Sequence, residues 1–465
     1  MAGQYDLVIL GSGPGGYVAA IRAAQWGLRT AVIEKDDRLG GTCLNVGCVP
    51  TKAFLFSAEV LDFVRNAAEY GIQCNPPTVD WNKVRERETQ IVRKHNKGIE
   101  FLFRKHKIET LRGVGALVAP GRIRVEGPEG ATEVTAKNII LATGSEARML
   151  PGLEADRERI LTNREILELP AIPKSMLIVG GGAVGVEFAS VFSRFGCQVT
   201  LVEMLPRILP LSDEEVSREL ERSFKKQSIP VLTNARVEKV EKQKDGVAVT
   251  LTHEDSQKSF NFEKVLIAVG RKPNTENIGL DKTRIETDRG YIKTNLRMQT
   301  AEPGIYAIGD IVAGSPQLAH VASMEGIVAV ATICGKKVPE MNYRTVPDCV
   351  YCEPQTSSVG LSEAKAKELG YNVRVGKFAF RANSKASILG AEEGFVKIVC
   401  EEKYGEVLGV HMIGPTVTEL IAEMALAMRL EATAEDIMYT IHAHPTLSEA
   451  VSDAANSVYS LTINA

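Results

Sequence analysis

Two cysteines five positions apart, Cys43 and Cys48, lie in the segment GGTCLNVGCVPTK at residues 40–52. They are either two buried thiols near a turn or a redox pair facing a cofactor. Five residues of regular helix rise about 7.5 Å, which exceeds the usual disulfide Cα separation of about 4.4–6.8 Å. A bridge therefore needs a distorted turn, for which Gly47 supplies the freedom. So short a ring adds little stability and should be easy to reduce, and Cys48 near a helix start would gain thiolate character.

A histidine and a carboxylate near the C-terminus could supply the base that thiol chemistry needs. His444 precedes a proline, and Glu449 follows five residues later. Thiol–disulfide exchange proceeds by thiolate attack, so a dithiol substrate needs a base near Cys43. A histidine oriented by a carboxylate suits that role. A buried structural histidine is the alternative for His444, and for His442 packing and function both stay open.

The elements that must position these residues include one unit that occurs twice. Residues 5–35 and 175–204 each read as an apolar strand, a G-x-G-x-x-G turn, a helix rich in small residues and a second apolar strand ending in Glu. The glycines permit a tight turn, close approach of a pyrophosphate and close helix–strand packing, and the acid can hydrogen-bond the ribose. The helix N-terminus attracts the phosphates. The residues concerned are Gly11, Gly13, Gly16 and Glu34 in the first copy, and Gly180, Gly182, Gly185 and Glu203 in the second.

The repeat predicts two dinucleotide sites rather than two ordinary Gly-rich turns. At the second site Glu203 favours a free 2′-hydroxyl and would repel a 2′-phosphate. An NADP site usually has an arginine at or just after this position, whereas Arg207 comes four residues later, so the sequence favours NAD. The first site lies just upstream of the cysteine pair, which suits a bound flavin better than a diffusing nicotinamide.

The bulk composition limits the class of protein. A chain of 465 residues suggests about three or four domains. The net charge of −3 leaves no basic surplus for nucleic acid or anionic lipid, and eight cysteines in so long a chain are no disulfide scaffold. The N-terminus shows no signal peptide, and the most apolar stretch, residues 176–192, is shorter than the ~20 residues of a membrane span. We expect a cytoplasmic protein; an organellar one without its presequence would look the same.

Four segments together resemble a known family. Residues 40–52 are similar to the redox-disulfide motif of the pyridine nucleotide–disulfide oxidoreductases, and LATGS at 141–145, VGRKPN at 269–274 and IYAIGDI at 305–311 are similar to its further FAD and NAD segments. The similarity covers essentially the whole chain. It implies an α/β fold with two Rossmann-like dinucleotide-binding domains, for FAD and for NAD, plus a C-terminal α+β dimerisation domain. It also implies a redox-active disulfide between Cys43 and Cys48.

The resemblance implies roles for further residues. The other subunit of an obligate homodimer would supply His444 and Glu449. Lys52 and Glu187 would pair beside the flavin, with a surface lysine and an ordinary helix glutamate as the alternative. Further implied FAD contacts are Lys35, Thr42, Lys52, Gly115, Thr143, Gly144, Asp310 and Ala319, and further implied NAD contacts are Val237 and Gly270. No Cys/His cluster has zinc spacing, so we expect no metal.

The implied domains are the first part of an FAD-binding domain at 1–150, an NAD-binding domain at 151–275, a central segment completing the FAD domain at 276–345 and an interface domain at 346–465. Within the family, HAHPT at 442–446 and the NAD preference favour members that oxidise protein-bound dihydrolipoyl groups. Their partners would be the lipoyl domains of a 2-oxoacid dehydrogenase complex or a lipoylated glycine-cleavage carrier. The alternative is a disulfide or metal reductase that uses NAD(P)H.

The remaining cysteines predict no second site. Cys349 and Cys352 match C-x-x-C, but they lie in a predicted strand, in which residues three apart point to opposite faces. We expect four isolated cysteines to be packing residues: Cys74, Cys197, Cys334 and Cys400.

Overall fold

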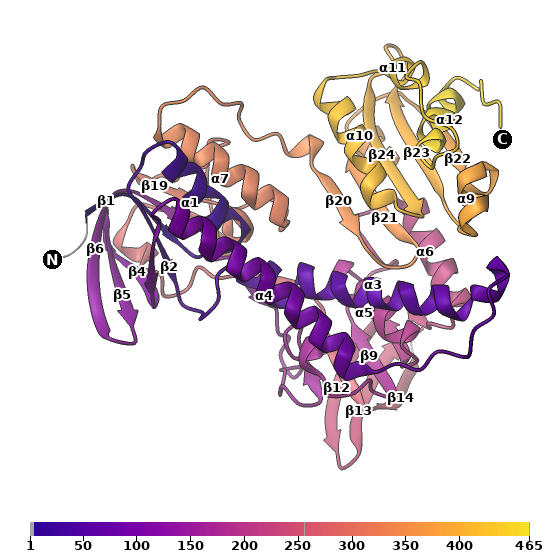
Figure 1. The fold of residues 1–465 in the computed structure, drawn as a ribbon, viewed down its shortest axis with the longest axis horizontal. Coiled ribbons are helices and arrows are strands. Elements are labelled where there is room, and N and C mark those ends of the chain that lie inside the picture. Colours follow the sequence, from indigo (N-terminus) through magenta and orange to yellow (C-terminus); the bar gives the residue numbers. More distant parts are fainter. Residues whose placement is uncertain (1–3, 255, 465) are drawn as a thin grey trace. The chain divides into compact units, whose positions relative to one another are not determined.

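The computed structural model describes residues 4–254 and 256–464, and the chain divides into two compact units made of separate segments (Figure 1). Unit 1 takes in Met1–Phe54, Asn82–Arg148 and Arg271–Tyr343. Unit 2 takes in Leu55–Trp81, Met149–Gly270 and Arg344–Ala465. Within the described ranges, no helix is both long and apolar enough to cross a membrane. The four-part domain division and the cytoplasmic location remain predictions.

Unit 1 is built on a seven-stranded sheet of order β3-β2-β1-β6-β5-β4, with β19 also paired to β6. Pairing is parallel from β3 to β6 and between β6 and β19, and antiparallel among β6, β5 and β4. The strands are β1 (Gln4–Leu10), β2 (Thr30–Glu34), β3 (Glu109–Arg112), β4 (Val114–Ala119), β5 (Arg122–Gly127), β6 (Gly130–Leu141) and β19 (Ile305–Ala307). Their apolar residues form one buried core cluster.

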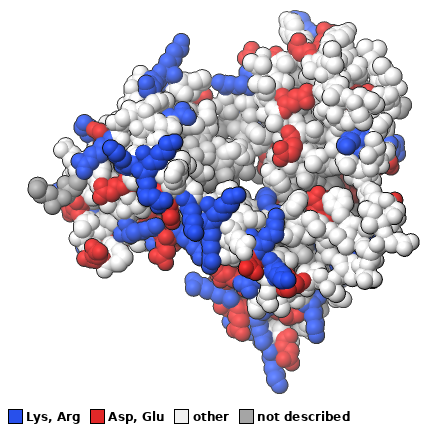
Figure 2. Space-filling model, viewed as in Figure 1, with Lys and Arg blue, Asp and Glu red and all other residues white. Residues whose placement is uncertain are grey.

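Helices α1 (Pro14–Gln25) and α7 (Ala319–Ile333) of unit 1 pack side by side (Figure 1). Gly326 permits this approach, because a Cβ there would lie 2.8 Å from the carbonyl oxygen of Gly15. The long helix α4 (Trp81–Lys105) is rich in Lys and Arg, and Figure 2 shows basic side chains gathered along it. Two short antiparallel ladders complete the unit, β7 (Ser145–Ala147) with β16 (Arg271–Pro273) and β17 (Thr287–Asp288) with β18 (Tyr291–Ile292).

The segment that carries the two cysteines is broken into two helices. Helix α2 (Gly41–Val46) ends before Gly47, and α3 (Cys48–Arg65) begins directly after it. Gly47 has φ −144° and ψ −112°, and a Cβ on it would lie 3.3 Å from Cys43 Cα. The distorted turn predicted at Gly47 is therefore present, and it brings the start of α3 back towards α2.

The first half of unit 2 holds a parallel five-stranded sheet of order β11-β10-β9-β15-β8. Helix α5 (Ala183–Arg194) follows β9, and α6 (Glu214–Lys226) follows β10 along the chain. An antiparallel three-stranded sheet comes next in sequence. The strands are β8 (Ile160–Leu161), β9 (Ser175–Val179), β10 (Gln198–Val202), β11 (Val231–Leu232) and β15 (Lys264–Ile267), then β12 (Ala235–Gln243), β13 (Gly246–His253) and β14 (Ser256–Phe262).

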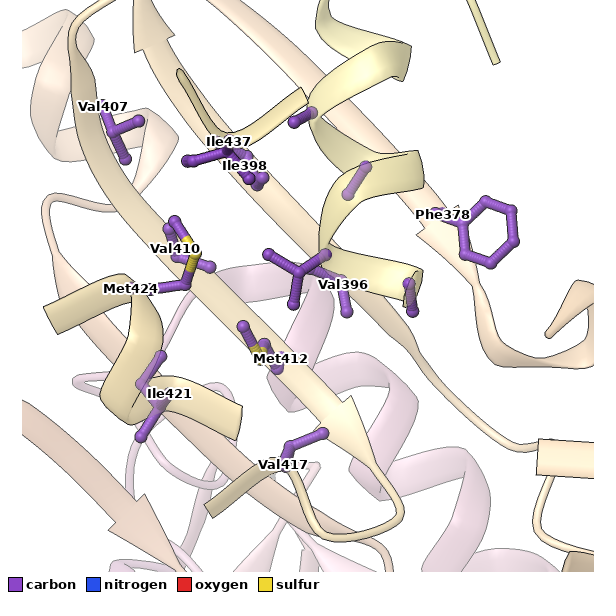
Figure 3. Packing of buried hydrophobic residues seen from close by; sticks show 14 of the residues in the cluster. Phe378, Val396, Ile398, Val407, Val410, Met412, Val417, Ile421, Met424 and Ile437 are labelled. Atoms are coloured by element: carbon purple, nitrogen blue, oxygen red, sulfur yellow. The ribbon is translucent and has the colours of Figure 1, made fainter. Parts of the chain in front are cut away.

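The C-terminal part of unit 2 is an antiparallel sheet of order β20-β21-β24-β23-β22. Its strands are β20 (Pro347–Val350), β21 (Gln355–Gly360), β22 (Val373–Ala379), β23 (Phe395–Glu401) and β24 (Val407–Gly414). The helices are α8 (Glu363–Glu368), α9 (Ser384–Leu389), α10 (Val417–Arg429), α11 (Ala434–Met438) and α12 (Glu449–Val458). Side chains of the central strands and of α10–α12 interlock in one apolar core (Figure 3). The predicted α/β fold with a C-terminal α+β part is confirmed.

The isolated cysteines differ in exposure. Cys197 and Cys400 are buried and Cys334 is partly buried, as expected of packing residues. Cys74 is exposed, with its sulfur 3.5 Å from the carbonyl oxygen of Val64. The prediction that Cys74 is a packing residue is wrong: Cys74 lies beyond the end of α3, at an exposed position outside the core. For the C-x-x-C pair, β20 ends before the second cysteine, and the two thiols contact different backbone carbonyls.

Candidate active site and cofactor sites

The first Gly-rich turn joins β1 to α1 in unit 1. A Cβ at Gly11, which has φ +106°, would lie 2.3 Å from the carbonyl oxygen of Ala142. A Cβ at Gly16 would lie 2.0 Å from the carbonyl oxygen of Gly11. At Gly13 a Cβ would meet nothing within 4 Å, and no side chain caps the N-terminus of α1. Open space in front of uncapped helix N–H groups is what a pyrophosphate requires.

The second Gly-rich turn joins β9 to α5 in unit 2 and repeats this geometry. A Cβ at Gly180, which has φ +110°, would lie 2.3 Å from the carbonyl oxygen of Ala268. A Cβ at Gly185 would lie 1.9 Å from the carbonyl oxygen of Gly180. Gly182 again has nothing within 4 Å, and α5 has no side-chain cap. Each unit therefore offers one place that fits a dinucleotide phosphate.

Matching hydrogen bonds hold the acid that follows each turn. Glu34 accepts through Oε2 from Ser12 N at 2.9 Å and Ser12 Oγ at 2.5 Å, and through Oε1 from the N–H two residues further on at 2.9 Å. Glu203 accepts through Oε2 from Gly181 N at 2.7 Å, and through Oε1 from the N–H two residues further on at 2.8 Å. Both carboxylates are thereby fixed beside the glycines, where a ribose would follow the phosphates.

Three of the segments predicted to bind FAD and NAD meet at one hydroxyl group. Ser145 Oγ donates to the Asp310 carboxylate across 165 positions of sequence. Arg271 Nε donates to Ser145 Oγ at 2.6 Å, and Arg271 Nη2 donates to the carbonyl oxygen of Ser145 at 2.6 Å. Burial lowers the pKa of Arg271, and the charges of Asp310 and Cys48 oppose this effect. The guanidinium therefore joins the predicted ribityl contact, Asp310, to the cysteine site, although Ser145 and Arg271 were not singled out from the sequence.

The other predicted FAD contacts on strands and turns are placed as follows. Thr143 Oγ1 donates to the Asn274 carbonyl at 2.6 Å, and Asn274 Nδ2 donates back to the Thr143 carbonyl at 3.0 Å. Beside Gly144 a Cβ would meet nothing within 4 Å. Lys35 is exposed just past β2. Gly115 is buried in β4, where a Cβ would lie 2.3 Å from a core leucine, so only its backbone can face a ligand.

A buried glutamate supports the turn that carries Asp310. Glu325 is 0% exposed, and its carboxylate accepts from Gly309 N at 2.5 Å, Ser315 Oγ at 2.6 Å and Tyr343 OH at 2.7 Å. Burial raises its pKa, and these three hydrogen bonds oppose that rise. Sequence reasoning missed Glu325. Its signal was a single acid in the otherwise apolar stretch of α7.

The two cysteines interact with one another across the Gly47 break. A hydrogen bond with Cys48 is the largest cause that raises the pKa of the Cys43 thiol, followed by burial, while the charge of Lys52 opposes the rise. Cys43 is therefore the partner that keeps its proton. Cys48 is the more exposed of the two, and Thr42 lies beside Cys43 in α2. A disulfide between the cysteines remains a prediction.

Helix α4 positions the cysteine segment through a buried amide. Asn96 is 5% exposed, and its Nδ2 donates to the Leu39 carbonyl at 2.7 Å and to Asn45 Oδ1 at 3.1 Å. Asn45 Nδ2 in turn donates to the carbonyls of Leu39 and Gly41 at 3.1 and 3.0 Å. The entry into α2 is thus fixed by side-chain amides that the sequence analysis did not identify.

The remaining predicted residues are dispersed. Glu187 in α5 is 5% exposed and accepts from Tyr351 N at 3.0 Å. It belongs to unit 2 and Lys52 to unit 1, so their pairing remains a prediction. Three further residues have only a position to report: Ala319 is the first residue of α7, Val237 is a partly buried residue of β12, and Gly270 is exposed and follows β15.

The histidine and glutamate predicted as the base are in contact. His444 Nδ1 is 2.9 Å from Glu449 Oε1, and Thr446 N donates to Glu449 Oε2 at 2.8 Å. Burial raises the pKa of Glu449, but the Thr446 N–H and His444 outweigh it and leave the pKa lowered. The His444 side chain is 71% exposed. Because Glu449 holds Nδ1, Nε2 is the nitrogen left to take a proton from a substrate.

Comparison with known proteins agrees with this geometry. The family model described as pyridine nucleotide-disulphide oxidoreductase matches residues 5–326, and the model for the dimerisation domain of that family matches residues 346–455. The chain belongs to this family. The resemblance seen in the sequence is confirmed, and the C-terminal sheet of unit 2 is the dimerisation domain of a pyridine nucleotide-disulphide oxidoreductase.

Relatives of this oxidoreductase match it over nearly their whole length. The dihydrolipoyl dehydrogenase of Bacillus subtilis is 46% identical to this chain, and the match covers 98% of each chain. That of Chlorobaculum tepidum is 44% identical over 98% of this chain and 97% of its own. The crystal structure of LpdA from Mycobacterium tuberculosis superposes with a TM-score of 0.90 at 31% identity, and the match covers 97% of this chain and 98% of the LpdA chain.

Among the described residues, no group of three or more His, Cys, Asp or Glu is placed to hold a metal ion.

Proposed function

We propose that this oxidoreductase is a dihydrolipoyl dehydrogenase, which oxidises protein-bound dihydrolipoamide to lipoamide and reduces NAD⁺ to NADH. The observation that carries the proposal is the Cys43–Cys48 contact, which lies within reach of the Arg271 charge at the Asp310 site. The two dihydrolipoyl dehydrogenases named above, at 46% and 44% identity, support the same activity.

The cofactors are FAD and NAD, and the residues present fit both. In each unit the middle glycine of the turn faces open space before an uncapped helix, and a fixed carboxylate stands at the ribose position. Unit 1 would hold FAD through the Gly11–Gly16 turn, Glu34 and Asp310. Unit 2 would hold NAD through the Gly180–Gly185 turn and Glu203. When bound, FAD would supply the two-electron redox chemistry between the cysteine pair and NAD⁺.

The chain's own residues handle the sulfur chemistry. His444 Nε2 accepts a proton from one substrate thiol, and Glu449 stabilises the imidazolium that forms. The substrate thiolate attacks Cys43 Sγ, so that the Cys43–Cys48 bond breaks and Cys48 leaves as thiolate. The second substrate thiolate then attacks the substrate sulfur bound to Cys43, which releases the cyclic disulfide and leaves Cys43 to take up a proton. The hydrogen bond between the two cysteines keeps that proton on Cys43.

The quaternary arrangement follows from the dimerisation domain. The family resemblance implies that a homodimer brings His444 and Glu449 of one subunit to the cysteine pair of the other. These two residues lie in the dimerisation domain and the cysteines in unit 1. The exposed His444 side chain fits a base that completes its site on a partner. The proposed substrates are lipoyl domains of a 2-oxoacid dehydrogenase complex or a lipoylated glycine-cleavage carrier.

The decisive experiment is a substrate panel on the purified, flavin-loaded protein. Dihydrolipoamide with NAD⁺ should give NADH at a rate far above that with NADP⁺, whereas glutathione disulfide and Hg²⁺ should not accelerate oxidation of NADH or NADPH. Rapid turnover of glutathione disulfide or Hg²⁺ with either nucleotide would instead establish the alternative, a reductase. The matched control is the same protein after its cysteines are alkylated in the reduced state, which must lose dithiol oxidation.

A further inference from the structure

A buried cluster of charges joins the C-terminal sheet of unit 2 to helix α6 in the first half of that unit. Lys397 lies on β23, and its side chain is 2% exposed. Lys397 Nζ donates to both carboxylate oxygens of Asp213 at 3.2 Å and to Glu215 Oε1 at 2.7 Å. It also lies 3.0 Å from Glu363 Oε2. The proposed function gives this cluster no role.

The cluster holds the beginning of α6. Asp213 is the N-cap residue of this helix, and its Oδ1 accepts from Glu215 N at 3.0 Å. Burial lowers the pKa of Lys397, but hydrogen bonds with Glu215 and Glu363 outweigh it and leave the pKa raised, so the ammonium group stays charged. Hydrogen bonds between charged groups are directional, whereas an apolar contact is not. Lys397 therefore fixes the position of the first turn of α6 relative to β23.

Helix α6 in turn holds the connection between β10 and α6, residues 203–213, which forms neither helix nor strand. Ile208 N donates to Glu221 Oε1 at 3.1 Å. The carbonyl oxygen of Leu209 accepts from Ser217 Oγ at 3.2 Å. Glu221 and Ser217 both belong to α6, so a shift of the helix is passed on to the connection.

The connection contacts the second Gly-rich turn at Gly181. Leu209 N donates to the carbonyl oxygen of Gly181 at 2.8 Å, and Gly181 N donates to Glu203 Oε2 at 2.7 Å. A Cβ on Gly181 would lie 2.8 Å from Ile208 Cγ2, so the turn and the connection approach closely. Each step from Lys397 to the turn is thus a direct contact between residues of unit 2.

We propose that Lys397 is a positioning residue for the NAD site, which sets the affinity for NAD⁺ by fixing α6 and, through it, the Gly180–Gly185 turn. A site whose groups are already in place loses less entropy on binding than one that must first be ordered. Without the cation, the first turn of α6 is no longer fixed to β23, and Leu209 no longer holds Gly181 in one place. This proposal rests on the proposed function, which assigns NAD to this turn.

The test measures the Kd for NAD⁺ of the flavin-loaded protein by isothermal titration calorimetry. Lys397→Met removes the cation, and Lys397→Arg keeps one. Ile398→Ala is the matched control: Ile398 is the next residue of β23, is 0% exposed and packs in the apolar core, on the opposite face of the strand from Lys397. Its replacement should destabilise the fold about as much as Lys397→Met does.

The variants should differ in affinity for NAD⁺. The Kd should rise by roughly 3–30-fold in Lys397→Met and by less than about twofold in Lys397→Arg and Ile398→Ala. An equal rise in Ile398→Ala would overturn the proposal, because loss of stability would then be the cause. An equal rise in Lys397→Arg would overturn it as well, because the cation would then not matter.

A double variant covers the case in which Lys397→Met does not fold, since that change leaves Asp213 buried without its cation. Lys397→Met/Asp213→Asn removes both charges, and the asparagine oxygen can still accept from Glu215 N at the N-cap. The double variant should bind NAD⁺ as weakly as Lys397→Met. Wild-type affinity for NAD⁺ in the folded double variant would refute the role of Lys397.

Kinetics supply a second readout. The KM for NAD⁺ should rise in Lys397→Met, whereas flavin reduction by dihydrolipoamide, followed by stopped-flow, should keep its rate because NAD⁺ takes no part in that step. A rate of flavin reduction lowered as far as the affinity for NAD⁺ would indicate a general folding defect and contradict the proposal. If the wild type oxidised no dihydrolipoamide, the proposed function would fail, but a calorimetric difference between Lys397→Met and Ile398→Ala would still support the role of Lys397.

Discussion

Arg271 Nε donates at 2.6 Å to the hydroxyl oxygen of Ser145, and that hydroxyl donates its proton to Asp310. The Arg271 guanidinium lies 3.8 Å from Asp310 Oδ2, so the serine is the closer link between the two charges. Because the hydroxyl accepts from one side and donates to the other, its rotation is fixed. The Asp310 carboxylate is therefore held in one orientation. The turn that carries it is also fixed, because Gly309 N donates to the buried Glu325.

We expect Ser145→Ala to weaken FAD binding without unfolding unit 1. The change removes a hydrogen bond to a charged group, worth about 1.5–3 kcal/mol, which corresponds to about tenfold or more in affinity. Flavin absorbance per protein after dialysis, and fluorescence titration of the apoprotein, measure the effect. Ser256→Ala, at an exposed residue of β14, is the control. Equal flavin retention by the two variants would show that the serine link is not needed.

Cys48→Ala should abolish dihydrolipoamide oxidation while FAD remains bound, because no disulfide can then form with Cys43. The hydrogen bond with Cys48 is the main cause of the raised pKa of Cys43, so its loss should lower that pKa. Alkylation of Cys43 near pH 8 should consequently be faster in the variant than in the reduced wild type. The exposed Cys74, replaced in Cys74→Ala, supplies the control. Retained lipoamide turnover in Cys48→Ala would refute the redox pair.

His444→Ala should slow the dithiol half-reaction by about 10²–10⁴-fold, the usual contribution of a positioned general base. Oxidation of the reduced flavin by NAD⁺ should hardly change, because no thiol proton moves in that step. Stopped-flow measurement of the two half-reactions separates these effects. A variant that slowed both half-reactions equally would point to a folding defect, and a wild-type rate would remove His444 from the mechanism.

Replacement of Glu203 should reduce the preference for NAD⁺ over NADP⁺. Glu203 also accepts from Gly181 N and Leu205 N, so alanine would leave two backbone donors without their partner. Glu203→Gln keeps an acceptor oxygen and removes the charge that repels a 2′-phosphate. We expect the ratio of kcat/KM for the two nucleotides to fall by about tenfold, or about 1.4 kcal/mol. Glu238→Gln, at an exposed position of β12, should leave the ratio unchanged.

A buried lysine in unit 2 predicts a pH-dependent stability. Lys397 is 2% exposed and lies 3.2 Å from Asp213, 2.7 Å from Glu215 and 3.0 Å from Glu363. Lys397→Met leaves the buried Asp213 carboxylate without its cation and should cost about 3–5 kcal/mol of unfolding free energy in urea. Lys377→Met, whose side chain is 42% exposed, should cost less than about 1 kcal/mol.

The acid limb of this stability has a defined direction. Burial raises the pKa of Glu215, but Lys377 and Lys397 outweigh it and lower the value from 4.5 to about 2. A lowered carboxyl pKa stabilises the fold above the unfolded value and loses that contribution as pH falls through the folded one. Wild-type stability should therefore decline from about pH 4.5 towards about pH 2, and Lys397→Met should decline less over that window. Parallel declines in urea titrations would exclude the Lys397 network as the cause.

The sequence predicted the features that depend on contacts between residues close together in the chain. Both Gly-rich turns could be read from spacing because each glycine answers to a contact within its own strand–turn–helix unit, such as Gly16 against Gly11. The Gly47 break followed from the short separation of the cysteines. The residues that orient the site escaped prediction because their partners are remote in sequence, as with Ser145 and Arg271, 126 positions apart. A short sequence pattern cannot predict a contact between residues so far apart in the chain.

The discontinuity of unit 1 has a consequence for the order of events during synthesis. Strand β19 and the turn carrying Asp310 complete a sheet whose first strand begins at Gln4. At roughly 5–20 residues per second, the ribosome needs about 13–50 s to add the ~260 residues that separate Cys48 from Asp310. The nascent chain therefore presents Cys43 and Cys48 well before the turn that carries Asp310 exists. With the roles proposed for these residues, cofactor loading is a late step, and a chain released early would carry the cysteine pair without a flavin to receive its electrons.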